Sequence, residues 1–282
     1  MKAGILKYFL MTAFMILMSG VSHADRPRAV SIDFCADQYL LALASNDQIV
    51  SISKQSLEPH SYYRDRAKTL PNFDGTLEQI LTLKNTHIMA TEGAYNVLPA
   101  LINYGIETIR TSYGHRPEVV YENIENFAKF LNQEERGQTL IKERQTILAK
   151  LQSLPSKNKT ILYLTPSGYT AGTSTYVDDV IKMAGYKSYA ETHGITSWQP
   201  LSLERVILNP PDLIITSFFD NKNVHVSHWS LTRHPKIVEL MDHIPTIPVP
   251  GQLSACGGLF SIEAADYIRN QADDLLKHEE IK

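Results

Sequence analysis

The chain has 282 residues, 27 basic and 30 acidic side chains, and a formal net charge of -3. This balance lacks the basic face that a nucleic-acid binder needs, and the length allows one large or two modest hydrophobic cores. Apart from its first residues, the chain has no stretch long and apolar enough to span a membrane.

Residues 1–24 are predicted to be an export signal. Lys2 and Lys7 give a positive n-region, Tyr8 to Met18 form an apolar run, and Ser22-His23-Ala24 is a cleavage site. An uncleaved anchor is the alternative, but the apolar run is short for a membrane span. Removing two lysines lowers the net charge from -3 to -5. We therefore expect a soluble protein in the periplasm, cleaved near Ala24.

Residues 25–116 alternate between strand and helix patterns. Strands are expected at 28–34, 49–52, 87–90 and 106–109, and helices at 36–44, within 75–83 and at 97–103. Residues 53–73 show no period and are expected to be a polar, aromatic loop. The alternation predicts an N-terminal α/β lobe with a parallel sheet.

Residues 117–155 carry a sustained helical period with no strand signal. Asn132 and Gly137 are the two points where this helix could be interrupted. It is too long for an ordinary βα unit, so we interpret it as a rigid helix between two lobes.

Residues 156–282 repeat the α/β pattern. Strands are expected at 160–164, 213–215 and 247–249, and helices at 175–184, within 202–209, at 236–241 and at 261–277. The predicted fold class is therefore α/β, with two similar lobes. Loops at the carboxyl ends of parallel strands form the usual ligand site of such folds.

One helix–strand unit occurs in both halves, at 75–91 and at 199–216. Each carries an apolar stripe at helical spacing, formed by Leu77, Ile80 and Leu81 in the first unit and by Leu203, Val206 and Ile207 in the second. Glu78 and Glu204 lie off these stripes, in the first helical turn, where the helix dipole favours a carboxylate.

Two cysteines occur, Cys35 and Cys256, and both remain after cleavage. Outside the cytoplasm an isolated pair is a candidate disulfide, which would link the first βα turn to the last one. Two unpaired thiols are the alternative.

Four stretches in this order resemble the periplasmic substrate-binding proteins of ABC importers for vitamin B12, ferric siderophores and haem. They are SIDFCADQYLLALA at 31–44, TAGTSTYVDDVIKMAGY at 170–186, TSWQPLSLERVILNPPDLII at 196–215 and RHPKIVEL at 233–240. The resemblance covers essentially the whole mature chain. It departs from the family at KNTHI (84–88), where Pro-Asp usually precedes the strand.

The resemblance implies a class III binding protein without enzymatic activity or cofactor, a monomer whose partners are a small-molecule ligand and the ABC permease. In the family a glutamate on each lobe docks against permease arginines, which assigns that role to Glu78 and Glu204. The alternative is a pair of solvated glutamates favoured by the helix dipole.

Aromatic and cationic side chains are frequent in the loops expected to line the cleft. Aromatic walls suit a flat chelate such as a corrin or porphyrin, and Trp198 matches an aromatic position of the vitamin B12 branch. Arginines would suit anionic groups such as haem propionates. The candidate ligand residues are Cys35, Tyr62, Tyr63, Tyr95, Tyr169, Trp198, Phe219, Trp229 and Arg233, with Phe218, Arg64, Arg66 and Arg116 also in these loops. Ordinary loop packing or solvated surface charge is the alternative for each.

The sequence also allows two other hypotheses about function. Loop histidines at 60, 115, 193, 225, 228 and 234 could hold bare zinc or manganese, although His225-x-x-His228 alone is a weak pattern. An exported hydrolase is less favoured, because the chain has no G-x-S-x-G elbow, no H-E-x-x-H helix and no P-loop.

Overall fold

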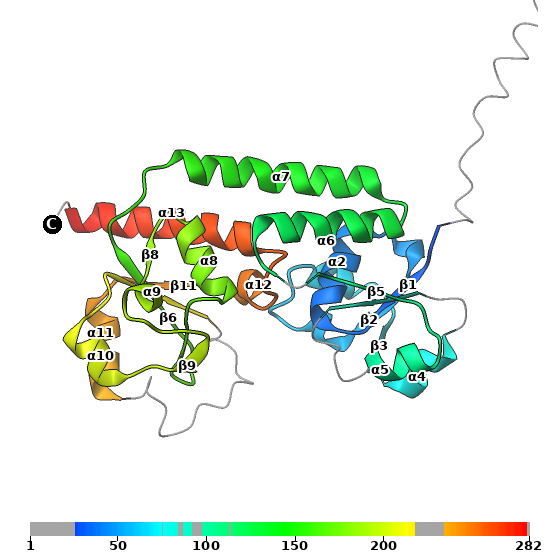
Figure 1. Ribbon diagram of the computed structural model, residues 1–282, viewed down its shortest axis with the longest axis horizontal. Coiled ribbons are helices and arrows are strands. Elements are labelled where there is room, and N and C mark those ends of the chain that lie inside the picture. Colours follow the sequence, from blue (N-terminus) through cyan, green and yellow to red (C-terminus); the bar gives the residue numbers. More distant parts are fainter. Residues whose placement is uncertain are drawn as a thin grey trace, which may run out of the picture.

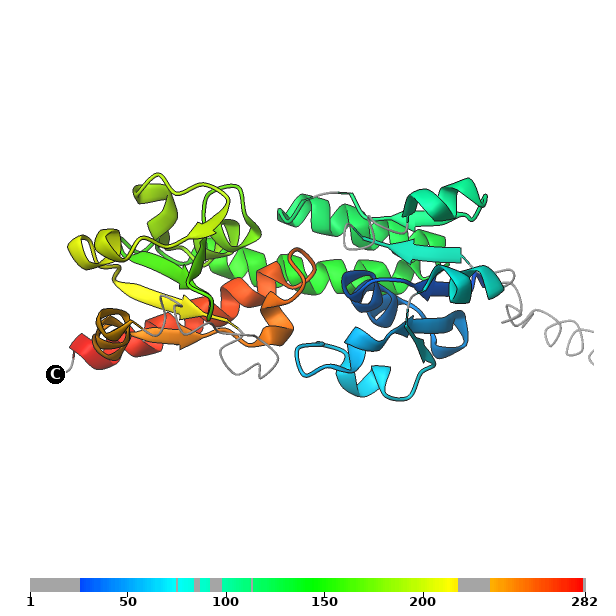
Figure 2. The same cartoon turned by 90° about the horizontal axis from the view of Figure 1, so that it is seen from below.

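The computed structural model describes residues 26–74, 76–83, 87–91, 98–112, 114–217 and 234–280. Two α/β lobes lie side by side, lobe 1 around a sheet from residues 29–110 and lobe 2 around sheets from residues 160–248 (Figures 1 and 2). The predicted fold class of two lobes with parallel sheets is confirmed. Within the described residues, no helix has the length and apolar character of a membrane span.

Lobe 1 contains a five-stranded parallel sheet in the order β3-β2-β1-β4-β5. Its strands are β1 (Ala29–Ser31), β2 (Ile49–Ser53), β3 (Asn72–Phe73), β4 (His87–Ala90) and β5 (Thr108–Arg110). Its helices are α2 (Phe34–Leu43), η2 (Asn46–Gln48), η3 (Lys54–Leu57), α3 (Arg64–Ala67), α4 (Leu77–Thr82) and α5 (Leu98–Asn103). The prediction of an irregular loop at 53–73 is thus wrong, because η3, α3 and β3 lie there.

Lobe 2 contains a four-stranded parallel sheet, β11-β10-β6-β8, and an antiparallel pair, β7-β9. Its strands are β6 (Thr160–Leu164), β7 (Tyr169–Ala171), β8 (Lys187–Ser188), β9 (Trp198–Pro200), β10 (Leu213–Thr216) and β11 (Thr246–Pro248). Its helices are α8 (Tyr176–Met183), α9 (Tyr189–Thr192), α10 (Leu203–Leu208), α11 (Pro235–His243), α12 (Gly251–Ser254) and α13 (Ser261–Glu280).

The segment predicted as one helix at 117–155 is two helices, α6 (Pro117–Phe130) and α7 (Glu134–Ser153). The chain reverses at Asn132, whose φ of 52° ends the helix in the left-handed region. Gly137 does not interrupt α7. A Cβ there would lie 2.5 Å from the Cβ of Ala128, so glycine lets the two antiparallel helices approach closely.

Helix α7 alone therefore spans the two lobes (Figure 1). Its Ile141 belongs to the core of lobe 1 and its Leu151 to the core of lobe 2. Because one helix contributes to both cores, the predicted helical connection between the lobes is present. It is formed by α7 and not by the whole of 117–155.

Between α12 and α13 the chain leaves lobe 2, contacts lobe 1 and returns, and we call this segment, residues 255–260, the second crossing. Leu259 and Phe260 in this crossing are buried in the core of lobe 1, whereas α13 packs in the core of lobe 2. The predicted disulfide is confirmed, and it joins Cys256 of this crossing to Cys35 at the start of α2. The disulfide thus fastens the second crossing to lobe 1.

The repeated helix–strand units occupy equivalent places in the two lobes, as α4 with β4 and α10 with β10. Ile80 and Val206 are buried, as the apolar stripes predict. Leu81 and Ile207 are not, since their side chains are 41% and 43% exposed. The two helices have six residues each and touch their lobes on one side only. The residue after the buried position lies about 100° around such a helix and faces outward.

A buried carboxyl anchors the segment after β2 in lobe 1. Asp37 of α2 is inaccessible to solvent and accepts hydrogen bonds from Ser53 N at 3.0 Å, from the Ser53 hydroxyl, and from Ser56 Oγ at 2.7 Å. Burial outweighs these donors and raises the pKa of Asp37 from 3.8 to about 7.

This shift predicts that lobe 1 loses stability as pH rises. Between pH about 4 and about 7 the folded state holds a proton on Asp37 that the unfolded chain has released. The free energy of unfolding therefore falls by about 1.4 kcal/mol for each pH unit across this window. Urea unfolding at several pH values should show this slope, and Asp37→Asn should remove it. The exposed Asp242→Asn is the control, and an equal slope in Asp37→Asn would contradict the assignment.

Candidate ligand-binding cleft

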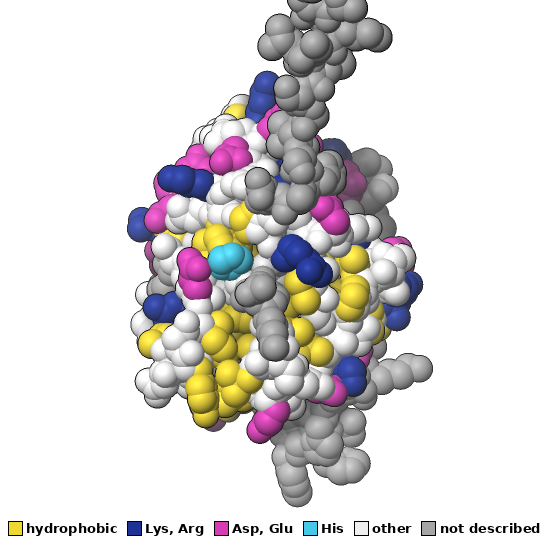
Figure 3. All heavy atoms as spheres, turned by 90° about the vertical axis from the view of Figure 1, so that its right-hand side faces the viewer, with side chains coloured by type: hydrophobic (Ala, Val, Ile, Leu, Met, Phe, Trp, Pro, Cys, Tyr) yellow, Lys and Arg dark blue, Asp and Glu magenta, His cyan; other side chains and the backbone are white. Residues whose placement is uncertain are grey.

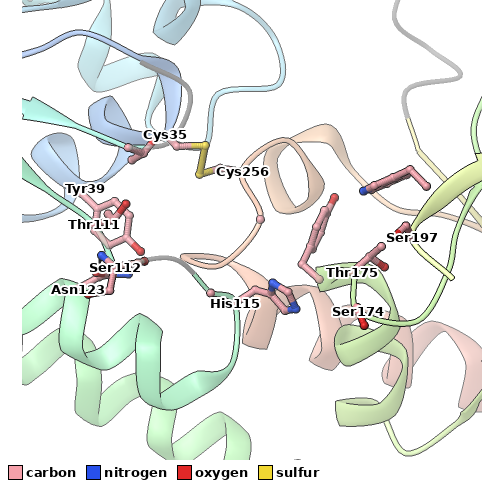
Figure 4. A pocket seen from close by; sticks show the side chains of 15 residues that line it. Cys35, Tyr39, Thr111, Ser112, His115, Asn123, Ser174, Thr175, Ser197 and Cys256 are labelled. Atoms are coloured by element: carbon pink, nitrogen blue, oxygen red, sulfur yellow. Dashed lines mark hydrogen bonds between the residues drawn. A yellow bond between two sulfur atoms is a disulfide. The ribbon is translucent and has the colours of Figure 1, made fainter. Parts of the chain in front are cut away.

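A cavity of about 370 Å³ lies where the two lobes face each other. Lobe 1 lines it with Cys35, Tyr39, Thr91, Thr111, Ser112, Gly114, His115 and Asn123. Lobe 2 and the second crossing line it with Ser174, Thr175, Tyr176, Ser197, Trp198, Cys256 and Gly257. Figure 4 shows the two sets facing each other across the cavity, with the disulfide at its edge.

Part of the wall from lobe 1 is formed by residues just beyond the carboxyl ends of β4 and β5. Thr91 directly follows β4 and is held by Asp33, whose carboxylate accepts from Thr91 N at 2.6 Å. Ser112 lies just beyond β5 and is held by Asn123 of α6, whose Oδ1 accepts from Ser112 N at 2.7 Å. These bonds fix the positions of the two strand ends in the wall, where the Thr91 hydroxyl also donates to Asp33.

The wall from lobe 2 depends on two tight turns that pack against each other, one before α8 and one before β9. Ser174 and Ser197 have φ values of 67° and 53°, which is costly for residues other than glycine. Gly172 allows the two turns to pack, because a Cβ there would lie 2.5 Å from the carbonyl carbon of Thr196. Strained residues of this kind cluster at functional sites, and here both lie in the cavity wall.

Trp198 stands at the lobe 2 side of the cavity. It begins β9, pairs with Ala171 of β7, and lies edge-on to Tyr163 with the ring centroids 5.7 Å apart. Its side chain is nevertheless 47% exposed. The β7-β9 pair, which the sequence did not predict, therefore holds a large aromatic surface open to solvent beside the cavity.

The described cavity wall is rich in neutral hydrogen-bonding groups and contains no lysine or arginine. Burial raises the pKa values of Tyr39 and Tyr176, and the Tyr176 hydroxyl donates to the carbonyl of Ser254. The lining residue His115 contacts lobe 2, with its Nε2 at 2.9 Å from Oδ2 of Asp179 on α8.

Of the predicted ligand residues, Cys35 and Trp198 line the cavity. The others that the structure describes lie elsewhere. Tyr62 and Tyr63 lie at the junction of the lobes, where the Tyr62 ring stacks on Phe260 with the centroids 4.4 Å apart. Tyr169 is exposed on β7, in register with Pro200 of β9. The remaining predicted residues, Tyr95, Phe218, Phe219, Trp229 and Arg233, lie outside the described residues.

The loop arginines that the structure describes do not line the cavity. Arg64 donates to the Leu57 carbonyl at 2.7 Å, and Arg66 donates to the carbonyls of Leu41 and Ala44. Arg116 is exposed at the start of α6. Arg64 thus ties α3 to the end of η3, and Arg66 ties α3 to the end of α2, where one guanidinium satisfies two carbonyls at once.

The histidines considered for a metal are dispersed. His60 packs against Phe34, His193 stacks on Tyr189, and His234 caps α11, while His225 and His228 lie outside the described residues. The described part of the chain holds no group of three or more metal-binding side chains.

Sequence reasoning missed the hydroxyl and amide groups of the wall, above all Tyr39, Asn123 and Tyr176. Tyr39 and Tyr176 lie in helices, where each fits an ordinary core pattern. The available signal was the cluster of hydroxyl residues at the expected strand ends and turns, TSYGH at 111–115 and TSTY at 173–176.

Two lobes, a rigid helix spanning them and a cavity walled by both define a solute-binding protein. The model of the periplasmic binding protein family matches residues 30–225, so the chain belongs to that family. Its members are non-enzymatic transport components that bind small molecules outside the cytoplasm and work with ABC permeases, which confirms the prediction that the chain is not an enzyme. No curated protein sequence matches the chain.

Solved structures agree in fold over nearly their whole length. The periplasmic haem-binding protein HutB of Vibrio cholerae is 25% identical, with a TM-score of 0.67 over 86% of this chain and 98% of its own. RhuT, a periplasmic haem-binding protein from Roseiflexus sp. RS-1, is 22% identical, with a TM-score of 0.67 over 88% and 99%. The vitamin B12-binding protein BtuF of Vibrio cholerae is 19% identical, with a TM-score of 0.67 over 89% and 98%.

Proposed function

We propose that the chain is the solute-binding component of an ABC importer and carries an iron chelate, haem or a corrinoid in the cleft between its lobes. The observation that carries this proposal is the cavity itself, because both lobes supply its walls and the half-exposed Trp198 stands beside it. A flat ligand can bury apolar surface against this indole while hydroxyl and amide groups bind its polar periphery.

Within this ligand class, the described wall favours molecules with uncharged hydrogen-bonding groups. No described lining residue is a lysine or arginine that could neutralise propionates or catecholates. A corrinoid, with its amide side chains, or a ferric hydroxamate is therefore expected to bind more tightly than an anionic chelate, although the haem-binding neighbours keep haem within the proposal.

Export and delivery complete the proposal. Residues 1–24 act as the cleaved signal, and the mature protein works as a monomer. Glu78 and Glu204, one on each lobe, bind arginines of the permease. Both side chains are exposed in the first turn of equivalent helices, α4 and α10, on the side of the molecule away from α7 (Figure 1).

A ligand panel tests the proposal. The purified mature protein is titrated with cyanocobalamin, haemin, a ferric hydroxamate, a ferric catecholate and zinc chloride, and binding is followed by quenching of tryptophan fluorescence. Saturable quenching by at least one chelate, with a Kd of about 1 μM or below, is expected. Tight binding of zinc alone would replace the proposal with a bare-metal carrier, and binding of none of the five would overturn it.

A further inference from the structure

Large hydrophobic side chains are exposed in two regions of the described chain. Tyr62, Tyr169 and Trp198 lie near the junction of the lobes, as described above. The other six lie on or directly after α4, α5, α10 and α11: Leu81, Ile102, Tyr104, Ile207, Leu208 and Val238. These four helices lie on the side of the molecule away from α7 (Figure 1). A gathering of exposed apolar side chains on one side of a protein is a feature of interaction surfaces.

Helices α4 and α10 are structural repeats down to individual side chains. Thr76 and Ser202 cap them in the same way, each accepting a hydrogen bond at 3.4 Å from the backbone N–H three residues later. A glutamate occupies the second helical position in each, and an exposed aliphatic side chain follows three residues later, namely Leu81 and Ile207. Glutamate and aliphatic side chain are spaced i, i+3 and are therefore neighbours on one helix face.

Each lobe enlarges this apolar surface with further residues. In lobe 1, Leu81 and the 64% exposed Tyr104 line a common hollow of about 500 Å³. Figure 3 views this end of the molecule and shows hydrophobic side chains gathered over its lower half. In lobe 2, Leu208 extends the surface and is 77% exposed.

We propose that these aliphatic side chains form two apolar contact patches for the permease, one beside each docking glutamate and centred on Leu81 in lobe 1 and Ile207 in lobe 2. This inference rests on the proposed function, because it takes the permease as the occupant. Two patches of the same construction on two lobes fit a partner that presents two equivalent surfaces, which is the geometry of a paired permease. The glutamates then provide orientation and on-rate, while burial of the apolar patches provides much of the affinity.

Binding to the cognate permease in lipid nanodiscs, followed by biolayer interferometry, tests this division. The variant Leu81→Ser with Ile207→Ser should weaken binding about tenfold or more and should do so equally at 50 mM and 500 mM NaCl, because apolar contacts are not screened. The variant Glu78→Gln with Glu204→Gln should weaken binding at low salt and much less at high salt. The exchange Leu81→Ile with Ile207→Leu keeps apolar side chains and should bind like the wild type.

Two further measurements separate this inference from the proposed function. Binding of cyanocobalamin, haemin and the ferric chelates should be unchanged in the serine variant, as should its thermal unfolding. If the wild type binds ligand and permease but the serine variant binds the permease equally well, only the inference fails. If the wild type binds none of these chelates, the proposed function itself fails. A wild type that does not bind the permease would overturn the inference. A wild-type dimer that the serine variant disrupts would also overturn it, because it would assign the patches to a second copy of the chain.

Discussion

Replacing both Cys35 and Cys256 by serine is expected to lower the free energy of unfolding by about 4 kcal/mol. The disulfide joins residues 221 positions apart in sequence, so it removes a large loop-closure entropy from the unfolded chain. It also holds the second crossing, with its buried Leu259 and Phe260, against α2 of lobe 1. Loss of the bond therefore weakens the junction of the lobes as well as the chain-wide constraint.

Urea unfolding with and without dithiothreitol measures this effect. Reductant should lower the stability of the wild type to that of the double serine variant and should leave the variant unchanged, which separates loss of the bond from the effect of the substitutions. Equal free energies of unfolding for the oxidised wild type and the variant would contradict the stabilising role of the disulfide.

Replacing Arg144 by methionine is expected to lower the free energy of unfolding by about 3–5 kcal/mol. Arg144 of α7 is 2% exposed, lies 2.8 Å from Glu263 of α13 through its Nη2, and donates from Nε to the carbonyl of Leu259 at 3.1 Å. Without the guanidinium, the buried Glu263 carboxylate has no cationic partner, and the contact that links α7 to the second crossing is lost.

A double-mutant cycle separates these contributions. Burial already raises the pKa of Glu263 despite Arg144, so Arg144→Met should raise it further. The folded variant then holds a proton that the unfolded chain releases above pH about 4.5, and its stability should fall more steeply with rising pH than that of the wild type. Arg144→Met with Glu263→Leu removes the lone carboxylate and should recover most of the loss. A double variant as unstable as Arg144→Met alone would contradict this explanation.

Periodicity and turn residues sufficed to predict the two-lobed architecture. Alternating strand and helix patterns predict both parallel sheets except for the short strands β3 and β8, and continuous apolar runs such as 213–215 form buried strands. The cysteine count and the predicted export signal made the disulfide a candidate, with two unpaired thiols as the alternative. In these cases a local pattern and the global fold favour the same structure, so a single sequence is enough.

The failures have a common physical cause, which is that tertiary packing decides between locally equivalent residues. Leu81 follows the same helical spacing as Ile80, but a six-residue helix with one face on its lobe buries only one of them. Gly137 and Asn132 both weaken a helix, yet only Asn132 ends it, while Gly137 meets Ala128 of the neighbouring helix. The hydroxyl wall of the cleft was missed because a serine or threonine after a strand has no feature that distinguishes ligand contact from a turn.

The residues that line the cavity differ from the predicted ligand residues for the same reason. Aromatic and cationic loop residues were expected to line the cleft, but Arg64 and Arg66 bind the carbonyls of a nearby turn and helix end. Trp198 is at the cleft because β7 and β9 pair. This short antiparallel pair joins two segments that were predicted to be a turn and a loop.

Binding by the variant Trp198→Ala tests the central claim that ligand is held in the cavity between the lobes. The chelate that binds most tightly in the panel is titrated by isothermal calorimetry, which needs no tryptophan signal. Loss of the indole should raise the Kd about 10- to 100-fold, the equivalent of burying one large aromatic side chain. Tyr104→Ala removes an exposed aromatic residue outside the cavity and should leave the Kd unchanged. An unchanged Kd in Trp198→Ala, or an equal loss in Tyr104→Ala, would contradict the assignment of this cavity as the ligand site.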